Sequence, residues 1–245
     1  MKKISQKIAA GLLAVSVAST GLAVNIQTAE ALNLGGIAGA VLGGGGAVDA
    51  NSLGQRQTLL LANLSVSSAL MNAAFQNCQL AVGESVANKS IIQTETITKG
   101  LNKSDMAEAT KLKNAAEKAE KDKTADTMKS NLKAALESGD EAKLKQIDGF
   151  IKTANQQRMI SDSLGAIAVV QAGKIIADTL KGGANISNLS KFVDTAKQAK
   201  SLLDTRSKFS KMLSTATAEY KKTRGIKDPS KNDIKAASDG LKANE

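Results

Sequence analysis

Apolar side chains recur at helical spacing along most of this chain. Between residues 51 and 99 they step alternately by three and four positions, with Ser68 in register: Leu61, Leu64, Met71, Phe75, Cys78 and Val82. This spacing is typical of a helical seam like that of a coiled coil. Residues 57–83 carry no charge, which also fits a membrane span. However, six Asn and Gln side chains within them favour a central, covered helix of a water-soluble bundle.

Three further long helices are predicted, each bounded by turn residues. The first begins at Ser104 or Asp105 and runs through a highly charged stretch to Ser138, the second covers residues 140–181, and the third covers residues 190–224. Asp228 followed by Pro229 predicts the start of a short helix that ends near Ala243. Residues 91–98 are rich in β-branched side chains, but nothing else resembles a strand to pair with them, so a helix is predicted there as well.

These elements predict an all-α fold. Helices of 35–45 residues joined by short turns favour antiparallel neighbours. We therefore expect residues 51–245 to form an elongated antiparallel bundle of about four long helices with a short C-terminal helix. A flexible Gly-rich segment would precede it at residues 32–50.

The first 31 residues have the pattern of a secretory signal peptide. Three lysines precede an uncharged, mostly apolar run over residues 8–24, and small residues then allow cleavage after Ala31. A cut after Ala23 and retention as a membrane anchor are the alternatives. The pattern predicts a secreted or periplasmic protein, bacterial in style.

The Gly-rich segment has two interpretations. Gly35, Gly39 and Gly43 recur every four residues, a ladder of small side chains that lets helices approach closely in lipid. In water each glycine costs a helix about 1 kcal/mol relative to alanine, which favours a loose linker.

Composition argues against most kinds of catalytic site. The chain has no histidine, which excludes a Ser-His-Asp triad, a Cys-His pair and a His-ligated metal site. Cys78 has no second cysteine to pair with, and we interpret it as a core residue; a disulfide between two molecules is the alternative. The glycines of residues 35–46 follow no predicted strand, which argues against a glycine-rich dinucleotide-binding motif. We expect no enzyme activity, cofactor or bound metal.

Basic residues gather towards the C-terminus. Residues 191–245 hold 13 basic and 7 acidic residues, against 17 and 15 in residues 32–190. An anionic partner, either a protein or the cell-envelope surface, is therefore expected at a basic C-terminal surface. Only four of the 33 basic residues are arginine and aromatic residues are few, which argues against nucleic acid. The candidate contact residues are Lys208, Lys211, Lys221, Lys222, Arg224 and Lys227.

Three functions remain open. The first, which we favour, is an exported, non-enzymatic interaction or scaffold protein that uses this basic surface. The second is a membrane-active protein that inserts through residues 32–48, either alone or together with residues 57–83. The third is a periplasmic holdase-type chaperone, which no particular motif supports.

Overall fold

A computed structural model describes residues 50–83, 90–99, 101, 106–181 and 186–241. These residues are all-α and contain no strand, as the sequence predicts. The predicted signal peptide and residues 32–49 of the Gly-rich segment, with the glycines at positions 35, 39 and 43, lie outside the described residues. Ala50, the last residue of the predicted segment, is the first residue of α3. The helices of the described part are α3 (Ala50–Val82), α4 (Thr94–Lys99), α5 (Ala107–Lys121), α6 (Thr124–Ser138), α7 (Glu141–Lys181), α8 (Ile186–Thr223) and α9 (Lys231–Leu241).

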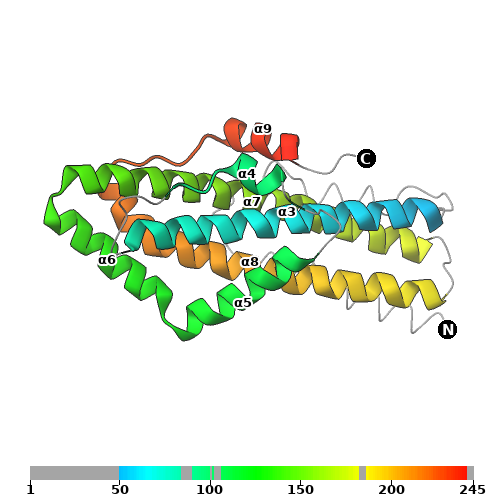
Figure 1. The fold of residues 1–245 in the computed structure, drawn as a ribbon. Coiled ribbons are helices and arrows are strands. Elements are labelled where there is room, and N and C mark those ends of the chain that lie inside the picture. The colour runs from blue at the N-terminus through cyan, green and yellow to red at the C-terminus, as the bar shows by residue number, and fades with distance from the viewer. Residues whose placement is uncertain (1–49, 84–89, 100, 102–105, 182–185, 242–245) are drawn as a thin grey trace.

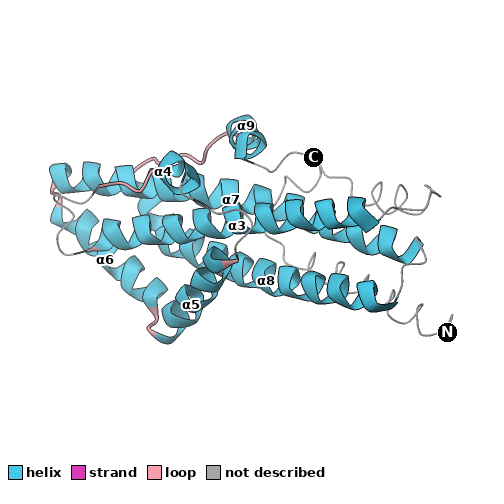
Figure 2. Ribbon diagram, turned by 45° about the vertical axis from the view of Figure 1, so that its right-hand side comes forward, coloured by secondary structure: helices cyan, strands magenta, loops and turns pink. Residues whose placement is uncertain are grey.

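The three long helices α3, α7 and α8 lie side by side, with α7 running opposite to the other two (Figure 1). Helices α4 and α9 lie along one side of this group, while α5 and α6 project from the opposite side in a V (Figures 1 and 2). The largest apolar cluster joins α3, α5, α6, α7 and α8, and includes Phe75, Leu112, Leu132, Ile151 and Phe209. Within it the rings of Phe75 and Phe209 are tilted against each other, with their centroids 4.7 Å apart.

Helix α3 supplies more buried apolar residues than any other described helix, because nearly its whole circumference is covered. Residues Leu53–Val82 are long and apolar enough to cross a membrane, yet 83% of their most apolar window is buried within the fold. The polar side chains on α3 meet polar groups of α7. Asn63 donates to Gln171 (2.9 Å), and the hydroxyls of Ser67 and Ser161 each donate to the other residue's backbone carbonyl (2.9 and 2.7 Å). Pairing of this kind removes most of the cost of burying polar groups.

The predicted single helix over residues 104–138 is wrong: the chain breaks at Asp122 and Lys123 into α5 and α6. The reason is the direction around the helix axis in which the apolar side chains point. At about 100° per residue, Met128 in a continuous helix would face about 160° away from Leu112. Both are fully buried in the same cluster, together with Ala119 and Leu132. Breaking the helix lets both apolar stripes reach one core.

Helix boundaries follow local chemistry. Gly139 and Gly225 adopt positive φ after α6 and α8, where a side chain would be strained. Asp140 begins α7 as predicted, since its carboxylate accepts from the N–H groups of Ala142 and Lys143 (both 3.1 Å). The predicted cap of the last helix is wrong: Ser230 accepts from the N–H of Asp233 (3.1 Å), so the cap lies two residues beyond Asp228.

Only part of the segment at residues 91–98 is helical. Ile91, Ile92 and Gln93 are not, and α4 begins at Thr94. The backbone of Ile92 is satisfied by side chains in place of a second strand. Asn77 both donates to and accepts from it (3.0 Å each), and Gln157 donates to its carbonyl (2.8 Å). This is why a short non-helical stretch persists here in an all-α fold.

Candidate functional site: the outer face of α8

The second half of α8 has an apolar inner face and a basic outer face. Phe209, Leu213, Ala216 and Tyr220 are at most 3% exposed and point into the largest cluster. Lys208, Lys211 and Lys222 lie on the opposite side of the helix and are exposed. Lys227, in the segment after α8, is exposed too. Among the described residues, none of these four lysines has an ion-pair partner.

The other two candidate residues point inward. Arg224 is 19% exposed and bridges the two carboxylates at the start of α7, with contacts of 2.8 Å to Glu141 and 3.0 Å to Asp148. The hydrogen bond from Arg224 lowers the pKa of Glu141, and the bonds to Asp148 and Glu141 raise the pKa of Arg224 itself. Arg224 therefore joins the end of α8 to α7.

Lys221 is also held inside the molecule. It is 13% exposed, forms an ion pair with Asp228, and donates to Asn155 of α7 (3.2 Å). Burial works to raise the pKa of Asp228, but the hydrogen bonds from Lys221 and Asn155 outweigh it, so this pKa is lowered. Of the six predicted contact residues, the structure thus places four outward and uses two to anchor the segment that leads to α9. We call Lys208, Lys211, Lys222 and Lys227 the lysine face.

A second polar cluster joins α7 to α8 further along, and sequence reasoning missed it. Asp162 lies between two arginines, with Arg158 at 3.3 Å and Arg206 on its other oxygen, and it accepts from the hydroxyl of Ser210 (2.8 Å). Gly165 makes room, because a Cβ there would be 2.5 Å from the guanidinium carbon of Arg206. The signal in the sequence was Arg206 itself, a charge inside an apolar stripe.

This cluster holds α8 against α7. Ser210 is only 6% exposed, and its hydroxyl is engaged by both Asp162 and Arg158 (3.2 Å). The carboxylate of Asp162 pairs with both guanidinium groups, which offsets part of the cost of burying them and fixes the register of α8 on α7. The buried hydroxyl of Tyr220 has a similar role: burial and its bond to Asp148 (2.9 Å) raise its pKa.

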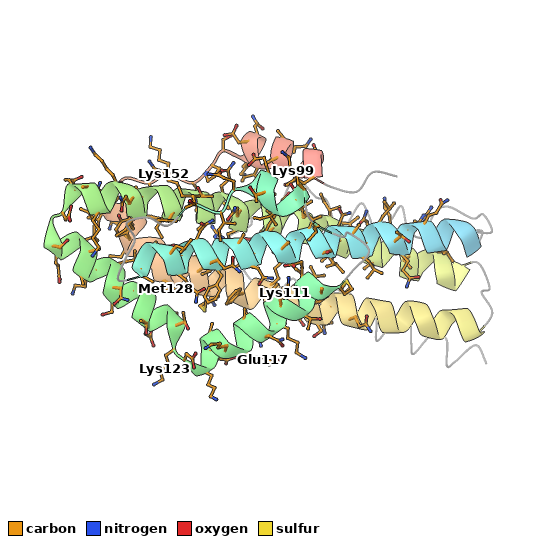
Figure 3. The ribbon with its side chains drawn as sticks, in the orientation of Figure 1. Lys99, Lys111, Glu117, Lys123, Met128 and Lys152 are labelled. Carbon is orange, nitrogen blue, oxygen red and sulfur yellow. The ribbon has the colours of Figure 1, made fainter. Side chains whose placement is uncertain are left out.

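A shallow groove of about 430 Å³ runs between α3 and α5. Most of its lining residues are polar or charged, and they include two short-range ion pairs, Lys111–Glu108 and Lys118–Asp122. Figure 3 labels Lys111 and Glu117 on α5. The lining residues are Asn72, Phe75, Gln76, Gln79, Glu108, Lys111, Ala115, Lys118, Ala119, Asp122 and Thr124.

Cys78 lies in the core. Its side chain is 2% exposed, and burial raises the pKa of its thiol to about 12, even though Arg158 and Lys221 act in the opposite sense. A neutral, covered thiol is a packing residue. Among the described residues, no group of three Cys, Asp or Glu side chains is placed to hold a metal ion.

Comparisons with known proteins give no guide to function. The chain matches no protein-family model, no curated protein and no solved structure.

Proposed function

We propose that this chain is an exported, non-enzymatic helical scaffold protein that binds an anionic surface through the lysine face of α8. In this proposal cleavage near Ala31 releases it to the periplasm or the cell exterior, and residues 51–245 form an elongated antiparallel bundle that holds the lysine face rigid. The observation that carries the proposal is a contrast between two sets of cations on α8 and in the segment that follows it. Lys221 and Arg224 form ion pairs inside the molecule, while Lys208, Lys211, Lys222 and Lys227 are exposed.

The lysine face is suited to long-range attraction. Its three helical members lie on one side of a helix whose inner face is locked to α7 by two ion-pair clusters, so their relative positions are fixed. Exposed charges act over about 10 Å at 0.1 M salt, and each basic residue near an anionic membrane contributes about 1 kcal/mol. Four lysines are therefore enough for weak, salt-sensitive binding.

The test is co-sedimentation of the chain lacking residues 1–31 with vesicles of phosphatidylcholine that contain about one third phosphatidylglycerol. We expect binding at low salt that weakens between 50 and 300 mM NaCl, and no binding to pure phosphatidylcholine. Replacing all four lysines by glutamine (K208Q, K211Q, K222Q and K227Q) should lower the affinity at least tenfold.

A matched control separates position from net charge. Lys121, Lys129, Lys143 and Lys152 are exposed and lie outside the lysine face, so replacing these four by glutamine removes the same total charge. This control should retain most of the binding. Equal losses in both quadruple variants, or binding that is indifferent to salt, would contradict the proposal.

The membrane-active alternative conflicts with the environment of α3. Insertion of residues 57–83 would break the contacts of Asn63 with Gln171, Ser67 with Ser161, and Asn77 with Gln157, and would place these polar groups in hydrocarbon. No feature of the described residues specifically favours the chaperone alternative.

A further inference from the structure

The break between α5 and α6 is unusual because no helix-breaking residue marks it. No glycine or proline occurs between residues 106 and 138. Only Asp122 and Lys123 separate the two helices, and Lys123 has φ +49°, the one positive φ of a non-glycine among the described residues. A left-handed conformation is strained for a lysine and persists only when tertiary contacts maintain it.

The contacts that maintain the break are modest on the α5 side. Its fully buried side chains are Ala109, Leu112 and Ala119, so leucine is the one large group among them. Helix α6 places two large side chains, Met128 and Leu132, in the core and is joined to α7 by a direct turn through Gly139. If one arm of the V moves, it is therefore α5.

We propose that α5 is a hinged lid on α3, which opens when Lys123 changes to the right-handed conformation and α5 and α6 fuse into one helix. The fused helix would cover residues 107–138, about 48 Å in length. Fusion relieves the strain at Lys123 and gives the N–H groups of Thr124 and Ala125, which begin α6, intrahelical acceptors on α5.

Opening changes which side chains of α5 and α3 are exposed. The same 160° phase difference that forces the break in the closed form turns Leu112 and Ala119 away from the core once the helix is continuous. At the same time, the side of α3 that lines the groove loses its cover, including Phe75 and the side chain of Asn72, which now donates to the carbonyl of Glu108 (3.1 Å). The lid thus controls access to a part of α3 that is separate from the lysine face.

The position of the lid can be measured by the distance between spin labels. Glu117 on α5 and Lys152 on α7 are both exposed (Figure 3), so each is replaced by cysteine and labelled in a Cys78→Ala background. Two substitutions at the hinge push the equilibrium in opposite directions. Lys123→Gly favours the left-handed conformation and weakens a continuous helix, whereas Lys123→Val disfavours the left-handed conformation more than lysine does.

We expect a second, longer distance in Lys123→Val that is at least fivefold less populated in Lys123→Gly. Lys129→Gly is the control, because Lys129 is exposed and helical in both states, and it should leave the distribution as in the parent. Helix content by circular dichroism should be unchanged in Lys123→Val. Identical distributions in both hinge variants, a loss of helix in Lys123→Val, or a long distance that vanishes on dilution would each overturn the lid.

Discussion

Asn77 of α3 holds the backbone of Ile92 as a paired strand would. Its amide nitrogen donates to the carbonyl of Ile92 and its amide oxygen accepts from the N–H, both at 3.0 Å. The same nitrogen donates to Gln157 of α7, so one buried side chain joins three segments. Such a network stabilises only when complete, because each unpaired buried group costs about 1–3 kcal/mol.

Replacing Asn77 by alanine should therefore destabilise the fold by about 2–3 kcal/mol, measured by urea unfolding. Gln79→Ala is the matched control, since Gln79 is an exposed amide on the same helix, and its effect should stay within about 0.5 kcal/mol. Equal effects of the two substitutions would show that Asn77 does not carry this network.

Gly165 and Arg206 should be energetically coupled. Alanine at position 165 gains about 1 kcal/mol in helix propensity but pushes the guanidinium of Arg206 off Asp162, because the two groups overlap. We expect Gly165→Ala to be more favourable by at least about 1 kcal/mol in an Arg206→Met background than in the wild type. Gly173→Ala, also on α7 and with open space around it, should stabilise both backgrounds equally.

Acid should weaken the join between α7 and the end of α8. The pKa values of Glu141 and Asp228 are lowered in the fold, so their stabilisation is present above the pKa near 4 of an unfolded carboxyl and is lost as pH falls through the folded values. The variant E141Q/D228N should thus be less stable than the wild type at pH 7 and equal to it near pH 2.

A control for general charge effects is E117Q/E137Q, whose side chains are about two-thirds exposed and lie 3.8–3.9 Å from their lysines. Its difference from the wild type should be small and should change little with pH. A wild-type advantage over E141Q/D228N that persists undiminished at pH 2 would contradict the assignment.

Cys78 should be inert in the folded protein. Because the thiol is buried and its pKa is raised to about 12, we expect an aromatic disulfide reagent at pH 8 to modify it at least about 100-fold more slowly than in urea. Stability should also decline as pH rises above about 9, since only the unfolded thiol then ionises. Rapid modification without denaturant, or a disulfide-linked dimer on a non-reducing gel, would make Cys78 an accessible residue.

Sequence periodicity predicted the helices better than it predicted their arrangement. On α3, Leu64, Met71, Phe75 and Cys78 of the predicted stripe are buried, and Leu61 and Val82 are partly buried. Leu164 and Phe209 are buried as well. A regular apolar stripe is covered whichever element packs against it, so spacing alone predicts its burial. The break at Asp122 was missed. It could have been predicted, because the apolar side of a continuous helix would point in a different direction after Ala119 than at Met128. Rules based on helix-breaking and helix-capping residues do not consider the direction in which apolar side chains point. They therefore fail where tertiary packing overrides helix propensity.

The candidate site was predicted only in part for a related reason. Charge counting placed six cations near the end of α8, but it treats all lysines and arginines as equivalent. Whether a cation faces outward depends on acids that are distant in the sequence, such as Asp148 for Arg224 and Asp162 for Arg206. Those pairings depend on how α7 lies against α8, which no local pattern contains.

In the proposed function the protein meets an anionic surface through lysines while α3 stays inside the fold. The hydroxyl oxygens of Ser67 and Ser161 are 3.1 Å apart, so cysteines at these two positions, in a Cys78→Ala background, can pin α3 to α7 by a reversible disulfide. The decisive measurement compares the affinity of the oxidised and reduced forms for the same anionic vesicles. The account predicts equal affinities with equal salt dependence; binding that is lost on oxidation and restored by reduction would show that α3 must leave the fold to bind.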